Sequence, residues 1–237
     1  MDLSSIFRFS DMVEYFPKIL SRFPVTLLIV VVSVAGGLVL GFILAAARIF
    51  KIPVLKELAA LYISFVRGTP ILVQLFVVYY GLPLLVAPLG VDINHWSKLF
   101  FVLVTYLLND GAFMSEIIRS SIESVPKGQL EAAASVGLTT FQTYKRIIIP
   151  QAFKIAAPAF GTRVVGSFQA TAMAFTLGII DMGQVKAIGT RTNRVLEGYV
   201  DAAIIFIIVS YLLERLFTWM EHRLNGQTRR KENGIAL

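Results

Sequence analysis

The residues best suited to act on a small polar ligand form two polar pairs inside otherwise apolar stretches. Asn109 and Asp110 lie near the middle of one stretch, and Gln169 and Thr171 lie in another. Strongly polar side chains within a membrane-spanning segment are costly unless they face a cavity or a partner. Their amide, hydroxyl and carboxylate groups can hydrogen-bond an ammonium or a carboxylate group. We therefore treat these four residues as candidates for a substrate pathway.

Each pair also has a purely structural interpretation. Asn109-Asp110-Gly111 is a pattern that breaks helices, and a broken helix exposes backbone groups to a ligand. The alternative is a kink whose polar groups are satisfied by neighbouring helices. Gln169 and Thr171 equally fit hydrogen bonding between helices. Asp110 and Glu116 would face different sides of one helix, which disfavours a catalytic acid pair and an integral membrane enzyme.

Composition excludes several classes of function. The chain has no cysteine and only two histidines, His95 and His222, which lie far apart in sequence. We therefore expect no metal site and no cofactor. The sequence contains no G-x-x-x-x-G-K-[ST] phosphate-binding loop, so we expect no ATP hydrolysis by this chain alone. Hydrophobic residues make up 56% of the chain, an excess over soluble domains that a bilayer can bury.

The elements that position the polar pairs are predicted to be membrane-spanning helices. Crossing the hydrocarbon core takes about 20 apolar residues. The stretches that meet this length are approximately residues 25–47, 71–89, 99–118, 147–180 and 200–219. We therefore expect an all-α integral membrane protein with five transmembrane helices, built as a single domain over residues 1–237. Residues 120–146 form a loop, and the residues before 25 form an amphipathic lead-in.

The distribution of Lys and Arg predicts the orientation. The richer side carries Arg48, Lys51, Lys56, Arg67, Arg119, Lys127, Lys145, Arg146 and the basic C-terminal tail. The other side carries Arg8, Lys18, Arg22, Lys98, Lys186, Arg191 and Arg194, diluted by acids. We therefore predict an outside N-terminus, a cytoplasmic C-terminus and a cytoplasmic 120–146 loop. Cations at membrane ends account for the net charge of +7 and attract anionic lipid, so we expect no nucleic-acid partner.

The 120–146 loop contains a second set of spaced residues. Gln129–Val136 predicts a short helix of good helix formers, and Gly137 accommodates the positive φ that ends one. Ala132 and Ala133 have small side chains, so another protein can approach closely. Glu131 lies near the helix N-terminus, where the helix dipole favours an acid. Periodicity alone also fits an amphipathic helix on the membrane surface.

Longer-range offsets link this loop to a known signature. Glu131-Ala132-Ala133 is followed at fixed distances by Gly137 and by Ile147-x-Ile149-Pro150. This pattern resembles the EAA signature of permease subunits of ABC importers, with Ile149 in place of Leu. Further stretches resemble polar amino-acid permeases: Arg67-Gly68-Thr69-Pro70, Val73–Phe76, Tyr79–Gly81, Ser115–Arg119, Ser124–Gln129 and Pro150–Ala152.

The resemblance implies a function and a set of partners. It implies a permease subunit of an ATP-driven amino-acid importer that works by alternating access. Glu131, Ala132, Ala133 and Gly137 would then belong to a coupling helix that contacts an ATP-binding subunit. The implied partners are two ATP-binding subunits, a second permease subunit in a homodimer or heterodimer, and an extracytoplasmic solute-binding protein.

Residues 168–176 set the expectation for the substrate. Many relatives carry Lys-Asp-Thr-Ser where this chain has Gln169-Ala170-Thr171-Ala172, which disfavours a basic amino acid. Phe168–Thr176 looks closer to a stretch of cystine and related sulfur amino-acid permeases, so L-cystine is the favoured substrate. The alternative function is an ion-gradient-driven secondary transporter or a channel, which the short chain without visible repeats disfavours.

Overall fold

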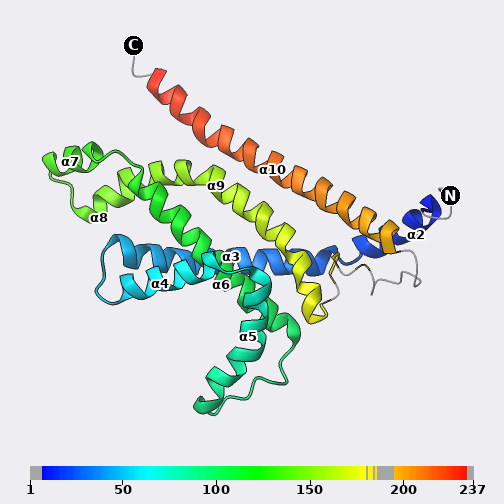
Figure 1. Ribbon diagram of the computed structural model, residues 1–237. Helices are drawn as coiled ribbons and strands as arrows, with labels where there is room; N and C mark the ends of the chain where they lie inside the picture. The colour runs from blue at the N-terminus through cyan, green and yellow to red at the C-terminus, as the bar shows by residue number, and fades with distance from the viewer. Residues whose placement is uncertain (1–6, 180, 184, 186–194, 234–237) are drawn as a thin grey trace.

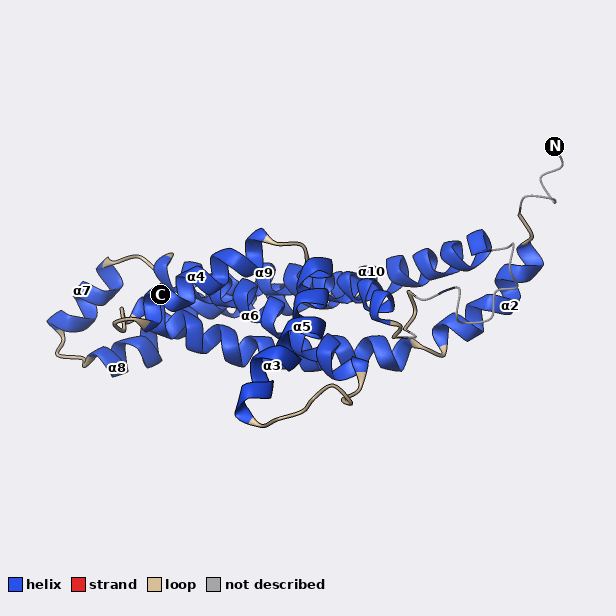
Figure 2. Cartoon of the chain, turned by 60° about the horizontal axis from the view of Figure 1, so that its bottom comes forward, coloured by secondary structure: helices blue, strands red, loops and turns tan. Residues whose placement is uncertain are grey.

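The computed structural model describes residues 7–179, 181–183, 185 and 195–233. Every regular element in this part of the chain is helical (Figure 2). The elements are α2 (Phe9–Leu20), α3 (Phe23–Ile49), α4 (Leu55–Gly68), α5 (Ile71–Val86), η1 (Ala87–Leu89), α6 (Lys98–Glu123), α7 (Gly128–Ser135), α8 (Thr140–Thr143), η2 (Tyr144–Ile148), α9 (Ile149–Ala170), η3 (Thr171–Leu177) and α10 (Val195–Asn233). Lys186, Arg191 and Arg194, used above for orientation, lie outside the described residues.

Within the described residues, four helical segments are long and apolar enough to cross a bilayer. They are Phe23–Ile49, Ile71–Leu89, Lys98–Glu123 and Val195–Leu224. The helix α9, in the predicted 147–180 stretch, has 22 residues but also holds Lys154, Arg163, Pro158 and two glycines. Its mixed composition explains why length and apolarity alone do not mark it as a span.

The helices α3 and α6 form the centre of the bundle, and small residues let them approach closely (Figure 1). A Cβ built on Gly37 would lie 2.6 Å from the Asp110 Cβ. A Cβ built on Gly41 would lie 2.9 Å from the Met114 Cβ. Gly37 and Gly41 lie one turn apart, in the small-xxx-small arrangement that allows membrane helices to pack backbone to backbone.

The helix α4 returns along α3 from the turn that follows Ile49 (Figure 1). Lys51 and Val54 adopt positive φ values of 52° and 65° in this turn. The chain then bends between α4 and α5, because Thr69 takes an extended conformation and Pro70 has no N–H to continue the helix. Arg67, counted above among the cations at a membrane end, therefore lies near the far end of a helix packed against α3 and α6.

A π-helical turn, η2, precedes α9 for a local chemical reason. Pro150 lies in the first turn of α9. Its ring would clash with the Arg146 carbonyl in a regular α-helix, and it cannot donate a hydrogen bond to it. The wider π turn over Tyr144–Ile148 contains Arg146 and relieves this conflict. The chain can therefore enter α9 directly from α8.

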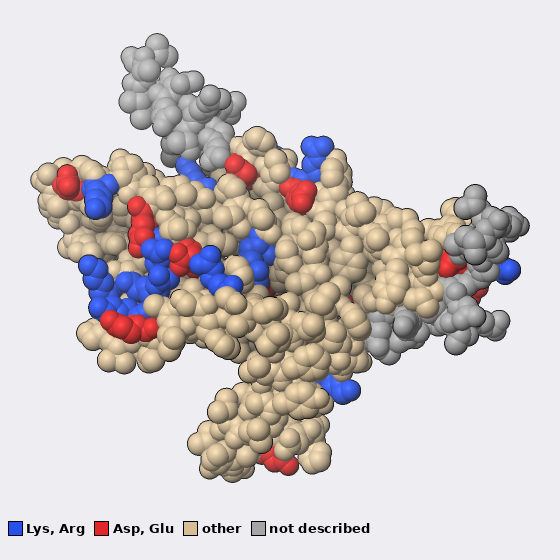
Figure 3. All heavy atoms as spheres, viewed as in Figure 1, with Lys and Arg blue, Asp and Glu red and all other residues tan. Residues whose placement is uncertain are grey.

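Apolar packing closes one end of the bundle. Ile19 of α2, Val30 of α3, Phe168 of α9 and Ile205 of α10 are buried in one cluster. The amphipathic α2 packs against α10 and contributes Tyr15 and Ile19 to this cluster. The small helices α7 and α8 lie at the opposite end of the molecule, where Lys and Arg side chains gather (Figure 3).

Candidate functional site

A buried ion pair lies at the middle of the bundle. Asp110 of α6 is fully buried, and the Arg163 Nε of α9 donates a hydrogen bond of 2.7 Å to its Oδ1. The Ser167 hydroxyl, one turn further along α9, donates to Asp110 Oδ2 at 2.8 Å. The Arg163 guanidinium also stacks on the ring of Phe113 at 4.1 Å from its centroid. Both carboxylate oxygens therefore have partners, as a buried charge requires.

Hydrogen bonds extend this pair to the bend between α4 and α5. Arg163 Nη2 donates to the Asn109 Oδ1 at 2.5 Å, and Asn109 Nδ2 donates to Gln74 Oε1 at 2.9 Å. Gln74 Nε2 in turn donates to the carbonyls of Val66 at 2.7 Å and Thr69 at 3.0 Å. These carbonyls lack helical partners because the helix stops there. We call Gln74, Asn109, Asp110, Arg163 and Ser167 the central network.

The central network decides between the two interpretations of Asn109-Asp110-Gly111. The helix α6 continues unbroken through these residues, from Lys98 to Glu123. The broken-helix interpretation is therefore wrong, and the polar groups are satisfied by neighbouring helices. Gly111 serves a packing role instead, because a Cβ there would lie 2.6 Å from a Leu40 methyl group.

The two candidates on the later stretch do not join the central network. Gln169 is exposed on another face of α9, and its amide donates to the Ser210 hydroxyl of α10 at 3.2 Å. Thr171 is buried, and its hydroxyl donates to the backbone carbonyl of Phe168 at 2.7 Å. Gln169 and Thr171 are close in sequence, but they have different surroundings in the fold and do not form one site.

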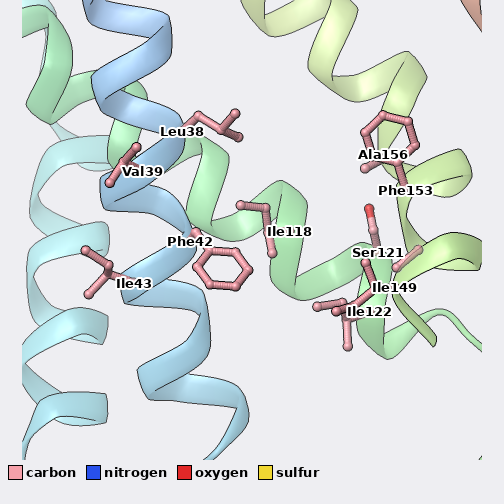
Figure 4. Close-up of a pocket in the computed structure, with 11 residues that line it drawn as sticks. Leu38, Val39, Phe42, Ile43, Ile118, Ser121, Ile122, Ile149, Phe153 and Ala156 are labelled. Carbon is pink, nitrogen blue, oxygen red and sulfur yellow. The ribbon is translucent and has the colours of Figure 1, made fainter. Parts of the chain in front are cut away.

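The surroundings of Gln169 are polar. A hollow of about 450 Å³ between α9 and α10 is lined by Thr162, Gln169, Glu214 and Glu221, together with apolar residues. A second hollow, between α3, α6 and α9, has about 480 Å³ and an apolar lining in which Ser121 supplies a hydroxyl (Figure 4). Leu38 and Phe42 of α3 and Phe153 of α9 are among its lining residues. Of these two hollows, the first has the polar lining that an amino acid with two charged groups requires.

The loop with the second candidate set projects from the end of the bundle. The helix α7 covers Gly128–Ser135, and Gly137 follows it with a φ of 77°. The Leu138 N–H donates to the Ala133 carbonyl at 3.1 Å and closes the helix end, as expected for a glycine in the left-handed conformation. Glu131 and Ala132 are exposed, whereas Ala133 is buried.

A capping box then starts the next helix. The Gln142 N–H donates to the Thr139 hydroxyl at 3.3 Å, and the Gln142 side chain accepts from the Thr139 N–H at 2.9 Å. Large apolar side chains nevertheless point to solvent around this loop: Val136 is 75% exposed and Phe141 is 72% exposed. A fixed loop that presents apolar side chains is typical of a surface that another protein covers.

Charged residues tie this end of α6 to α3. The Arg48 guanidinium donates to Glu116 Oε2 at 2.7 Å, and Arg119 pairs with both Glu116 and Glu123. Glu116 and Arg119, one turn apart on α6, form an ion pair, and Arg48 extends it. The aromatic rings of Phe50 and Tyr144 also meet, with centroids 5.5 Å apart. The ends of α3 and α6 are thereby held together and joined to η2 beside the loop.

Comparison with known families identifies this architecture. Residues 37–226 match the family described as "Binding-protein-dependent transport system inner membrane component". The chain belongs to this family. Its membership confirms the expected membrane permease role and places ATP hydrolysis in a separate subunit. It also favours this role over the ion-gradient-driven transporter or channel that was considered above.

Individual members of the family cover nearly the whole chain. The L-cystine transport system permease protein TcyL of Bacillus subtilis (strain 168) is 42% identical over 91% of this chain and 91% of its own length. The probable amino-acid ABC transporter permease protein PatM of Vibrio harveyi is 38% identical over 92% and 97%. The predicted resemblance to amino-acid ABC permeases, including the cystine branch, is thus confirmed.

Two solved transporter structures contain chains with this fold. A chain from an amino acid ABC transporter crystallised with histidines matches with a TM-score of 0.82 and 31% identity, over 92% of this chain and 99% of that chain. A chain of the MetNI methionine ABC transporter in an inward-facing conformation matches with a TM-score of 0.70 at 17% identity, which shows the fold alone.

Sequence reasoning missed two members of the central network. Gln74 was read only as part of a motif, and Ser167 was not considered. For Arg163, the sequence left open whether the side chain faces a partner subunit, a lipid head group or a cavity acid such as Asp110. A usable signal was present, because Arg163 and Ser167 lie one turn apart on one face of α9. Such a polar face inside an apolar helix requires a polar partner on the helix it contacts.

Proposed function

We propose that this permease imports L-cystine or a related polar amino acid as part of a complex driven by ATP. The observation that carries the substrate assignment is the 42% identity to the L-cystine permease over 91% of both chains. The Phe168–Thr176 stretch supports it, because Gln169 and Ala170 stand where many relatives carry the charged pair Lys-Asp, and loss of that pair disfavours a basic substrate. An uncharged Gln169 suits a substrate whose side chain has no net charge.

The coupling role falls to Glu131, Ala132, Ala133 and Gly137. Their support is the match to the EAA pattern together with an exposed α7 flanked by exposed Val136 and Phe141. In this proposal α7 docks on an ATP-binding subunit. Since α6 ends just before α7 and α9 begins just after α8, movement of α7 is transmitted to both long helices. Closure of the ATP-binding subunits thereby changes which side of the permease is open.

Substrate passage is proposed to use Asn109, Asp110, Gln169 and Thr171 in different ways. Gln169, exposed beside the polar hollow, is the member best placed to touch an amino acid. Asn109 and Asp110 act indirectly, because their polar atoms bind Gln74 and Arg163 rather than the substrate. Thr171 shapes the junction of α9 and η3 through its bond to the Phe168 carbonyl.

The proposed topology has five transmembrane crossings in a single domain, with α9 as the fourth. Its N-terminus lies outside and its C-terminus and α7 in the cytoplasm. The support is the concentration of Lys and Arg at the end of the molecule that carries α7 (Figure 3). A membrane-impermeant thiol reagent tests it, since the chain has no cysteine. In a permease expressed without its ATP-binding subunits, Val136→Cys should react in inverted vesicles and remain unlabelled in intact cells; labelling in intact cells would contradict this orientation.

The proposed assembly contains two permease subunits, two ATP-binding subunits and an extracytoplasmic solute-binding protein. Family membership supports these kinds of partner. The deciding experiment for the substrate is ATP hydrolysis by the reconstituted complex with its binding protein. L-cystine should stimulate hydrolysis more than glutamine, arginine or histidine. Equal stimulation by arginine would contradict the assignment to the cystine branch.

A further inference from the structure

Arg67 occupies an unusual place for a charged side chain. It is exposed, yet α4 runs along α3 and away from the charged end of the molecule (Figure 1). With a rise of 1.5 Å per residue, Arg67 lies about 18 Å along the axis from the start of α4 at Leu55. Its guanidinium reaches Phe113, in the middle of α6. Both helices therefore place Arg67 deep within a hydrocarbon layer about 30 Å thick.

An exposed guanidinium at this depth cannot face lipid tails without a large cost. Phosphate groups lie beyond its reach from the middle of the bilayer. Other residues on α4 indicate which way it faces. Leu58, Leu61 and Phe65 are exposed and apolar, as lipid contacts require, whereas Arg67 follows the exposed Ser64 by one turn. The side of α4 with Ser64 and Arg67 therefore suits an aqueous pathway.

The charges near Arg67 do not balance. The Phe113 ring has the Arg163 guanidinium at 4.1 Å and the Arg67 guanidinium at 5.6 Å from its centroid. Asp110 pairs with Arg163. No carboxylate of the described residues lies within ion-pair distance of Arg67. Two cations and one anion leave a local excess of positive charge.

We propose that Arg67 binds the carboxylate group of the transported amino acid midway through the membrane. A guanidinium binds a carboxylate with two parallel hydrogen bonds, and this geometry is favoured where water is scarce. The central network keeps Arg163 occupied and holds the bend after α4, so Arg67 is the guanidinium left for the ligand. This inference rests on the proposed function, since it assumes that an amino acid passes this point.

Direct binding to the complex tests the proposal. The permease, assembled with its ATP-binding subunits in nanodiscs and without the solute-binding protein, is titrated with radiolabelled L-cystine. Arg67→Gln should weaken binding by about ten-fold or more, and Arg67→Lys should weaken it less because the charge remains. Cystamine, which is cystine without its carboxylates, should not compete. Unchanged affinity in Arg67→Gln, or equal competition by cystamine, would overturn the proposal.

The matched control is Arg215→Gln. Arg215 is also an exposed arginine over an aromatic ring, at 5.1 Å from the Tyr211 centroid, but it lies on α10. The Arg215→Gln variant should bind L-cystine with the same affinity as the unmodified chain. ATP-driven uptake by the unmodified complex tests the proposed function separately. Two results would refute only the inference about Arg67, provided that this uptake occurs. One is normal binding of L-cystine by Arg67→Gln, and the other is no binding of L-cystine by the unmodified complex.

Thiol reactivity gives a second test that tolerates a poorly assembled Arg67→Gln variant. Arg67→Cys introduces the chain's single thiol, and Leu61→Cys places one on the apolar side of α4. An anionic, water-soluble methanethiosulfonate should modify the thiol at 67 and leave that at 61 unmodified, because thiols react as thiolates in water. Failure to modify position 67 would overturn the proposal, since the site would then be dry.

Discussion

Asp110 and Arg163 join α6 to α9 through a buried ion pair, with Nε and Oδ1 2.7 Å apart. These are the two helices that lead into and out of the segment containing α7. A charged contact between them, reinforced by the Ser167 hydroxyl, fixes their relative position at the middle of the bundle. In the proposed mechanism, movement of α7 would therefore displace α6 and α9 together as one unit.

Removing one member of this pair should be far more damaging than removing both. Asp110→Leu leaves the Arg163 charge without its carboxylate and should lower stability by about 3–5 kcal/mol. The double variant Asp110→Leu with Arg163→Leu removes both charges and should recover part of that loss. Thermal unfolding of the purified permease in detergent measures the stability of the single and the double variant. A double variant less stable than Asp110→Leu would contradict the role of the pair.

The close approach of α3 and α6 predicts the effect of added side-chain volume. A Cβ at position 41 would lie within about 3 Å of the Met114 Cβ and of the Ser115 backbone nitrogen. Gly41→Val should therefore destabilise the chain by several kcal/mol. Gly81→Val on α5 is the matched control, because nothing lies within 4 Å of a Cβ there. It should cost less than about 1 kcal/mol. Equal thermal shifts would contradict this packing.

Gln169→Ala should separate transport from stability. The amide contributes one bond of 3.2 Å to Ser210 and is otherwise exposed, so its loss should cost about 1 kcal/mol or less. Its position beside the polar hollow predicts a several-fold loss of L-cystine uptake in proteoliposomes. Ser120→Ala, which removes an exposed hydroxyl bonded to the Ile117 carbonyl on α6, serves as the control with normal uptake. Normal uptake by Gln169→Ala would exclude Gln169 from the pathway.

Charge reversal on α7 should weaken assembly without affecting insertion. Glu131→Lys places a cation near a helix N-terminus and on the proposed docking surface. The variant should reach the membrane at normal levels but retain less ATP-binding subunit during co-purification. Glu14→Lys, an exposed acid on α2 at the other end, should retain the normal amount. Full retention by Glu131→Lys would count against the coupling role.

The sequence predicted individual helices better than the contacts between them. Apolar stretches at residues 25–47 and 71–89 correspond closely to the helical segments Phe23–Ile49 and Ile71–Leu89, because long apolar runs without charges mark membrane helices. Gly137 ends α7 with the expected positive φ. These features depend on a few neighbouring residues, and local chemistry was enough to predict them.

Features set by distant residues were predicted less well. Asn109-Asp110-Gly111 has the local composition of a break, but Gln74 and Arg163 satisfy its polar groups and α6 continues. Arg67 was assigned to a membrane end because four residues beyond it a new apolar stretch begins. Its true place follows from α4 packing on α3 and α6. Only tertiary contacts supply that information.

Uptake by the reconstituted complex tests the central claim most directly: an exposed α7 transmits the work of an ATP-binding subunit to this bundle. The complex is reconstituted in proteoliposomes with the binding protein and L-cystine outside, and all ion gradients are collapsed. ATP is supplied on the side that carries the ATP-binding subunits. We predict accumulation of L-cystine that requires ATP and falls sharply in Glu131→Lys. Accumulation that proceeds without ATP when an ion gradient is imposed, and is unaffected by Glu131→Lys, would contradict the account.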